Sequence, residues 1–127
     1  MSTMLKDIKS TVLNQYMQFE RTLVEKIVLV ADDEPPVARA LQRALSGHDV
    51  VVVNNGREAL DEWAREPFDV MFCDVMMPGL MGMDIYDALK QGGRGYHQRV
   101  IFMTGGAFTP EAQGFLKAVE NPHIEKP

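Results

Sequence analysis

Residues 27–36 read IVLVADDEPP, and this short stretch contains the pattern that decides the fold. The run 27–31 is apolar and rich in β-branched side chains, as a strand buried on both faces of a sheet would be. Three acidic residues follow it, and two prolines then begin a helix that we expect to continue to about Ser46. A buried strand followed by a helix is the repeating unit of a parallel α/β sheet.

The same alternation of apolar runs and amphipathic stretches continues along the rest of the chain. Further strands are predicted at 50–53, 70–73, 100–103 and around Ile124. Further helices are predicted at 57–65, 83–90 and 110–119, with Thr109 as the N-cap of the last. Because the crossovers between parallel strands place helices on both faces, the pattern predicts a doubly wound α/β domain.

The composition is that of one soluble domain. A length of 127 residues leaves little room for a second domain, and the single cysteine, Cys73, excludes an internal disulfide and favours a reducing, cytoplasmic compartment. Cys73 itself is expected to be a buried core residue. The net charge of −5 disfavours direct binding to nucleic acid. No signal peptide or membrane-inserting segment is predicted.

Polar residues follow the predicted strands, at the rim where a parallel α/β sheet places its functional site. These residues are Asp32, Asp33, Glu34, Asp74, Thr104 and Lys126. Crowded carboxylates resist ionisation, and Mg²⁺, which prefers oxygen ligands, relieves their repulsion. A hydroxyl and an ammonium beside them could hold a phosphoryl group on Asp74, because phosphoryl transfer depends mainly on charge placement and positioning.

Each of these elements also has an ordinary explanation when it is taken alone. An Asp pair after a strand is commonly a helix cap, a single Asp is commonly an Asx turn, and a terminal lysine is commonly solvated. Their joint occurrence at the ends of separate strands favours the phosphoacceptor interpretation.

The chain resembles the receiver domains of response regulators in two-component signalling. The motifs that carry the resemblance are VLVADDE at 28–34, FCDVMMPG at 72–79, FMTGG at 102–106 and EKP at 125–127. The resemblance implies a flavodoxin-like, doubly wound, five-stranded parallel sheet of order 2-1-3-4-5. It also implies that a histidine kinase or a histidine phosphotransfer domain donates the phosphoryl group, and that the domain then switches conformation to signal to a downstream protein domain. Such a domain is a phosphoacceptor that catalyses its own phosphorylation and dephosphorylation, rather than an enzyme acting on a separate substrate.

The resemblance assigns a role to individual residues. It implies that Asp74 is the phosphoacceptor, that Asp33, Asp74 and the backbone carbonyl of Met76 bind Mg²⁺, and that Asp32 acts through a metal-bound water. It implies further that Thr104 and Lys126 bind phosphoryl oxygens, and that the peptide bond between Lys126 and Pro127 is cis. Thr104 and residue 123 would form the switch. The family often has Tyr or Phe at 123, whereas His123 stands here and would report the movement by hydrogen bonding.

The two ends of the chain depart from the usual five-helix receiver. The chain stops where the fifth helix would start, and residues 4–24 have an apolar stripe with the 3.6-residue period of an amphipathic helix. We therefore expect residues 1–26 to form an N-terminal helix or linker, and residues 27–127 to form the receiver domain. The helix is expected to occupy the place of the missing fifth helix, either in its own chain or by exchange in a homodimer.

Three alternatives concern the class of protein. The segment TGGAFTPEA at 104–112 is similar to receivers at the C-terminal end of hybrid histidine kinases, and a stand-alone single-domain response regulator is the alternative. A phosphohydrolase of the haloacid dehalogenase type would need an acid at position 76, where Met76 stands. A flavin-binding flavodoxin is disfavoured because three acidic residues would repel the flavin phosphate.

The remaining histidines, His48 and His97, are expected to lie at the surface.

Overall fold

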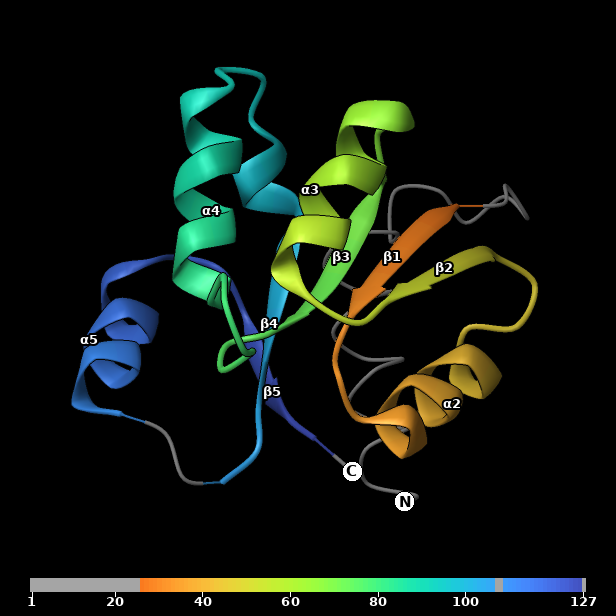
Figure 1. The fold of residues 1–127 in the computed structure, drawn as a ribbon, viewed down its shortest axis with the longest axis horizontal. Coiled ribbons are helices and arrows are strands. Elements are labelled where there is room, and N and C mark those ends of the chain that lie inside the picture. Colours follow the sequence, from red (N-terminus) through yellow and green to blue (C-terminus); the bar gives the residue numbers. More distant parts are fainter. Residues whose placement is uncertain (1–25, 107–108, 127) are drawn as a thin grey trace.

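Five parallel strands form the central layer of the computed structural model, which describes residues 26–106 and 109–126 (Figure 1). The strands are β1 (Ile27–Ala31), β2 (Asp49–Val53), β3 (Val70–Asp74), β4 (Val100–Thr104) and β5 (His123–Glu125). Their order in the sheet is β2-β1-β3-β4-β5, and every pair of neighbours is parallel. The predicted fold and strand order are therefore confirmed.

The helices begin and end close to where the sequence predicts. They are α2 (Pro35–Ala44), α3 (Gly56–Arg65), α4 (Gly82–Gln91) and α5 (Pro110–Ala118). Two prolines begin α2, and the hydroxyl of Thr109 caps α5 by accepting a hydrogen bond from the backbone N–H of Ala112. A short 3₁₀ helix, η2 (Tyr96–Arg99), was not predicted from the sequence.

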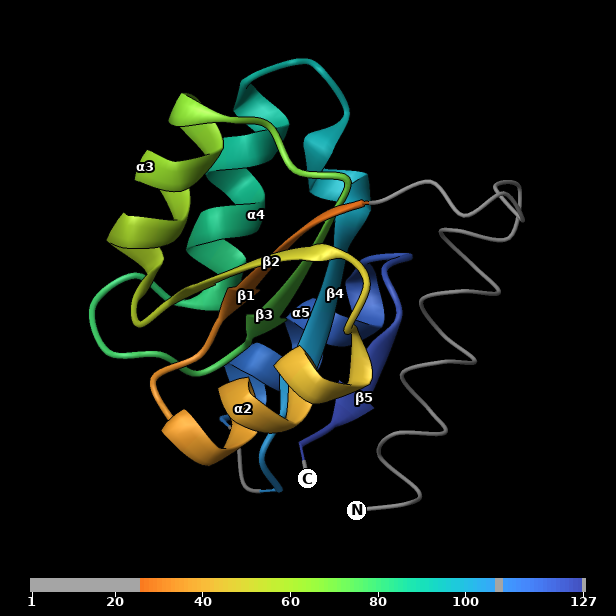
Figure 2. The same ribbon diagram turned by 90° about the vertical axis from the view of Figure 1, so that its right-hand side faces the viewer.

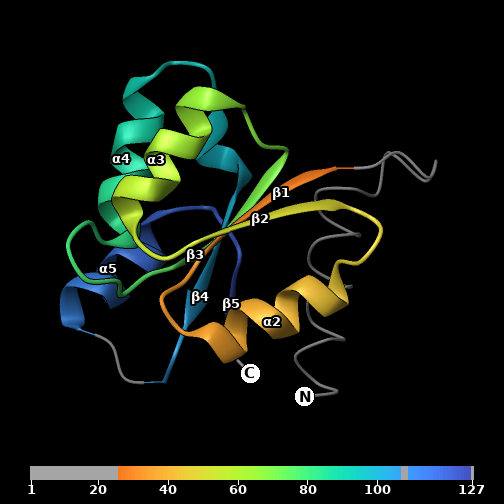
Figure 3. The same ribbon diagram turned by 45° about the vertical axis from the view of Figure 1, so that its right-hand side comes forward.

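The helices cover the two faces of the sheet unequally. Alternate residues of β1 point to opposite faces: Leu29 packs with residues of α3, α4 and α5, whereas Val28 and Val30 pack with residues of α2. Figures 2 and 3 show α3 and α4 on one side of the sheet and α2 on the other. The strands β3 and β4 are buried throughout. Cys73 lies in this core, and burial raises the pKa of its thiol, as expected for an inert core residue.

The strand β5 is the last element within the described residues. Two further expectations concern residues outside the described part of the chain, namely the N-terminal helix at 4–24 and the cis peptide bond before Pro127. In residues 26–106 and 109–126, no helix has both the length and the apolar character needed to cross a membrane.

Neither His48 nor His97 is as exposed as the sequence suggested. The Nδ1 atom of His48 accepts a hydrogen bond from the backbone N–H of Lys26, at 3.1 Å. The ring of His97 lies edge-on to Tyr86, with 5.3 Å between the ring centroids. Both histidines are half-buried, so the expected surface positions are only partly observed; for His97 the reason is that η2 packs against α4 and places this ring in an aromatic cluster.

Candidate functional site

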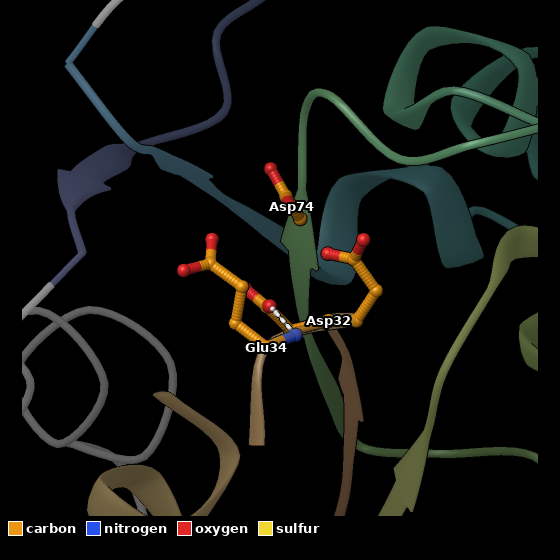
Figure 4. Close-up of side chains that lie close together, drawn as sticks. Asp32, Glu34 and Asp74 are labelled. Atoms are coloured by element: carbon orange, nitrogen blue, oxygen red, sulfur yellow. Dashed lines mark hydrogen bonds between the residues drawn. The ribbon is translucent and has the colours of Figure 1, made fainter. Parts of the chain in front are cut away.

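The carboxyl ends of the central strands bring the predicted site residues to one rim of the sheet. Parallel pairing sets Ala31 of β1 opposite Cys73 of β3. The next residue along each strand, Asp32 and Asp74 respectively, therefore lies beside the other. Figure 4 shows Asp32, Glu34 and Asp74 gathered around the end of β3. Asp32 and Asp74 are 1% and 2% exposed, which is unusual for carboxylates and requires compensating partners.

Lys126 is the cation that compensates these carboxylates. Its Nζ donates hydrogen bonds to Asp74 Oδ2 at 2.7 Å and to Glu34 Oε1 at 2.6 Å, and it forms an ion pair with Asp32 Oδ2 at 3.0 Å. Its backbone N–H donates to the carbonyl of Thr104 at 2.8 Å, which anchors the end of β5 beside β4. Burial lowers the pKa of Lys126, but the bonds to Asp74, Glu34 and Asp32 outweigh burial and raise it, so the ammonium stays charged at neutral pH.

Asp74 is held at both of its carboxylate oxygens. Oδ1 accepts a hydrogen bond from the backbone N–H of Met76 at 3.0 Å, and Oδ2 accepts the bond from Lys126. Burial raises the pKa of Asp74 and the charge of Asp33 raises it further, whereas the bonds from Lys126 and Met76 lower it. The net shift is upward, so ionising this carboxyl group costs free energy that a nearby cation would recover.

Asp32 has an incomplete set of partners. Its Oδ1 accepts a hydrogen bond from the backbone N–H of Glu34 at 2.7 Å. Its buried Oδ2 accepts no hydrogen bond from the described residues, because the approach of Lys126 is an ion pair without hydrogen-bond geometry. Burial raises the pKa of Asp32, and the hydrogen bond from Glu34 and the ion pair with Lys126 only partly oppose this.

The acidic residues of this rim fit a hard divalent cation. The group consists of Asp32, Asp33, Glu34 and Asp74. Each contributes one carboxylate oxygen, and these four oxygens lie within 4.8 Å of one another. All donors are oxygens, one of them is a buried oxygen without a hydrogen bond, and Asp33 is exposed to water. Mg²⁺ prefers such a site, where it binds one or two carboxylates and keeps several waters.

Thr104 ends β4 at this rim, whereas His123 begins β5, and neither makes a described contact with Asp74. The hydroxyl of Thr104, a residue 5% exposed, donates a long hydrogen bond of 3.5 Å to the carbonyl of Ile124. His123 begins β5, opposite Phe102 in the β4–β5 register, and it is exposed. It borders a shallow pocket of about 250 Å³ together with residues of α5. The structure therefore places His123 on the α5 side of β5, away from the acidic cluster.

Two contacts that shape the site were not predicted from the sequence, one made by Gly82 and one by Glu34. Gly82 begins α4, and a Cβ atom there would lie 2.9 Å from Val75 Cα and 3.0 Å from the carbonyl oxygen of Asp74. Only glycine allows α4 to pack this closely on the backbone that carries Asp74. Glu34 was predicted to lie at the rim, but its hydrogen bond to Lys126 could not be read from the run of three acidic residues.

Comparison with known proteins identifies consistent relatives. The family model of the response regulator receiver domain matches residues 28–127. The uncharacterized transcriptional regulatory protein YkoG of Bacillus subtilis is 31% identical over 102 residues, which cover 79% of this chain and 44% of that protein. The sensory/regulatory protein RpfC of Xanthomonas campestris is 31% identical over 102 residues, covering 78% of this chain and 14% of that protein.

Solved structures agree with these sequence relatives. The chemotaxis protein CheY4 of Vibrio cholerae has a TM-score of 0.69 at 27% identity, with 82% of this chain and 88% of that chain covered. The signal receiver domain of a histidine kinase from Syntrophus aciditrophicus has a TM-score of 0.68 at 28% identity, with 80% of this chain and 79% of that chain covered. The chain spans less than half the length of the curated relatives YkoG and RpfC.

Proposed function

The chain belongs to the family of response-regulator receiver domains in two-component signalling, and on this premise we propose that Asp74 accepts the phosphoryl group. The donor is a phosphohistidine of a histidine kinase or of a histidine phosphotransfer domain. A P–O bond forms to a carboxylate oxygen of Asp74 while the P–N bond breaks, and its electron pair stays on the imidazole nitrogen. The observation that carries the proposal is the contact between Asp74 Oδ2 and Lys126 Nζ at 2.7 Å.

We propose that Asp33, Asp74 and the backbone carbonyl of Met76 hold Mg²⁺, with Asp32 acting through a water. The cluster of carboxylates and the buried oxygen of Asp32 that accepts no hydrogen bond support this assignment. When bound, Mg²⁺ neutralises charge that develops on the phosphoryl oxygens. The residues themselves then need only to hold the carboxylate of Asp74 in place. We therefore propose that the domain catalyses its own phosphorylation and dephosphorylation and does not turn over a separate substrate.

Lys126 and Thr104 are the proposed ligands of the phosphoryl oxygens. Lys126 is charged and already lies beside the acceptor. Thr104 has only a 3.5 Å bond to the carbonyl of Ile124, so a phosphoryl oxygen offers its hydroxyl a stronger acceptor. Turning this hydroxyl would move the loop that begins at Gly105, and we propose that Thr104 and His123 report phosphorylation to the partner in this way.

The chain spans less than half the length of its curated relatives YkoG and RpfC, so the role of the whole protein is a further proposal. We favour the receiver part of a hybrid histidine kinase, working in the cytoplasm and signalling to another protein domain. A stand-alone response regulator is the alternative. The relatives include a sensor histidine kinase, GacS, of which the match covers 12%, and transcriptional regulatory proteins such as YkoG, of which it covers 44%. A homodimer is a further proposal, in which residues 1–25 of one copy would pack on the other copy.

The experiment that tests the proposal is labelling with acetyl phosphate in the presence of Mg²⁺, followed by intact-mass measurement. The wild type should gain one phosphoryl group, and Asp74→Asn should gain none. Asp87→Asn is the matched control, because Asp87 is exposed on α4 and its side chain makes no hydrogen bond or ion pair within the described residues. Equal labelling of the Asp74→Asn protein would disprove the assignment.

A further inference from the structure

Glu34 combines an exposed side chain with a short bond to a buried cation. Its side chain is 58% exposed, yet Oε1 lies 2.6 Å from the Nζ of Lys126, whose side chain is only 8% exposed. Glu34 is also the N-cap residue of α2, and its backbone N–H donates to Asp32 Oδ1. These contacts fix its backbone beside the acceptor, and Figure 4 shows its side chain next to those of Asp32 and Asp74.

Three carboxylates therefore share one ammonium before any phosphoryl group arrives. Asp32 and Asp74 are buried, and separating either of them from Lys126 would leave a buried charge without a partner, at a large cost in free energy. Glu34 can move into water at little cost, because exposed ion pairs contribute little stability. A phosphoryl group on Asp74 adds oxygens that compete for the N–H groups of Lys126, so Glu34 is the partner that is displaced.

We propose that Glu34 is a positioning residue that holds Lys126 in the unphosphorylated domain and thereby slows phosphorylation. This inference rests on the proposed phosphorylation of Asp74. Glu34 borders an open cavity of about 320 Å³ that Thr104, Gly105 and Lys126 also line. Its negative charge thus lies where a phosphoryl donor approaches, and its hydrogen bond occupies the lysine that the transferred group needs.

Glu34 also belongs to the acidic cluster, so a role as a ligand of Mg²⁺ is the competing explanation. The two roles predict opposite effects of Glu34→Gln. Loss of a metal ligand slows phosphorylation at low Mg²⁺, and saturating Mg²⁺ restores the wild-type rate. Loss of a restraint on Lys126 speeds phosphorylation when Mg²⁺ is saturating.

The test compares Glu34→Gln with Glu125→Gln. Glu125 borders the same cavity and is exposed, but its side chain makes no hydrogen bond or ion pair in residues 26–106 and 109–126. Both variants remove one negative charge at this opening, and only the first weakens a bond to Lys126. The rate constant for labelling by acetyl phosphate is measured at saturating Mg²⁺. We expect a rise of about three- to tenfold for Glu34→Gln and of less than about twofold for Glu125→Gln.

Binding of beryllofluoride, a mimic of the phosphoryl group, provides a second readout that folding stability alone would not move. Its dissociation constant should fall about three- to tenfold in Glu34→Gln and remain near the wild-type value in Glu125→Gln. Equal effects of both substitutions on the rate, or slower labelling of Glu34→Gln, would overturn the inference. The proposed function fails separately, if the wild type is not labelled or if Asp74→Asn is labelled.

Discussion

The ammonium of Lys126 lies 2.7 Å from the carboxylate of Asp74, although the two residues are 52 positions apart in the chain. Asp74 ends β3 and Lys126 follows β5, and these strands do not pair with each other. The strand β4 lies between them, and its Thr104 carbonyl accepts the backbone N–H of Lys126. The contact therefore depends on the correct register of three strands.

Asp74→Asn should raise the free energy of unfolding at pH 7, measured in EDTA. Burial raises the pKa of Asp74 above the ordinary value of an aspartate, which we take for the unfolded chain. Such a group stabilises the fold below its unfolded pKa, and this contribution is lost as the pH rises through its folded pKa. At pH 7 the wild type therefore carries the cost of a buried ionised carboxylate, which asparagine lacks.

We expect a gain of about 0.5–1.5 kcal/mol at pH 7, and a smaller gain at pH 4.5. Urea denaturation at the two pH values measures the difference, with the exposed Asp87→Asn as the control. A gain that grows as the pH falls would contradict the assigned direction of the pKa shift.

Asp33→Ala should abolish Mg²⁺-dependent labelling by acetyl phosphate, whereas Asp32→Ala should weaken it. The reason is that we assign Asp33 to direct binding of the ion and Asp32 to binding through water. Titration of the labelling rate with Mg²⁺ measures both effects, and Asp87→Ala is the matched control on α4. Labelling of the wild type that continues unchanged in EDTA would show that the metal has no role.

Beryllofluoride should change backbone hydrogen exchange in the segment that follows β4. The new acceptor at Asp74 competes with the carbonyl of Ile124 for the hydroxyl of Thr104, so Thr104, Gly105, Gly106 and Thr109 are the residues expected to respond. Thr104→Ala should lose this response while it remains labelled, and Thr104→Ser should retain it. Changes confined to α2 and α3 would be inconsistent with Thr104 as the switch.

Gly82→Ala should destabilise the domain by about 1–3 kcal/mol. Its Cβ would lie 2.9 Å from Val75 Cα, a backbone atom that cannot turn aside as a flexible side chain can. Gly114→Ala is the matched control, because it lies within α5 and its Cβ would meet nothing within 4 Å. That substitution should stabilise by about 0.5–1 kcal/mol. Urea denaturation measures the change in the free energy of unfolding for both variants. Equal changes would show that the contact at Gly82 is not tight.

Deletion of residues 1–24 should lower the melting temperature by roughly 4 °C or more. These residues lie outside the described part of the chain, so their amphipathic helix stays a prediction from the sequence. Among the described helices only α2 contributes to the core on its face of the sheet. Thermal denaturation and gel filtration measure the effect. An unchanged melting temperature in a monomeric truncated protein would indicate a passive linker.

Local patterns in the sequence were sufficient to predict the fold and to predict that the acidic residues and Lys126 meet at one rim of the sheet. Buried parallel strands such as β3 and β4 require continuous apolar runs, and prolines or capping residues begin helices, so each element can be recognised from its own residues. The ends of parallel strands meet at one rim whatever the details of packing, and for this reason Asp32, Asp74 and Lys126 could be placed together in advance.

Only the tertiary structure decided how these residues divide their contacts. The sequence does not indicate that Glu34 reaches Lys126, that the hydroxyl of Thr104 bonds to Ile124, or that Gly82 packs on the backbone of Asp74. It also placed His97 at the surface, whereas η2 carries its ring against Tyr86. Such contacts depend on side-chain rotamers and on the distance between elements far apart in the chain. Hydrophobic periodicity reports which face of an element is buried, but it does not report which polar atom on that face meets which partner.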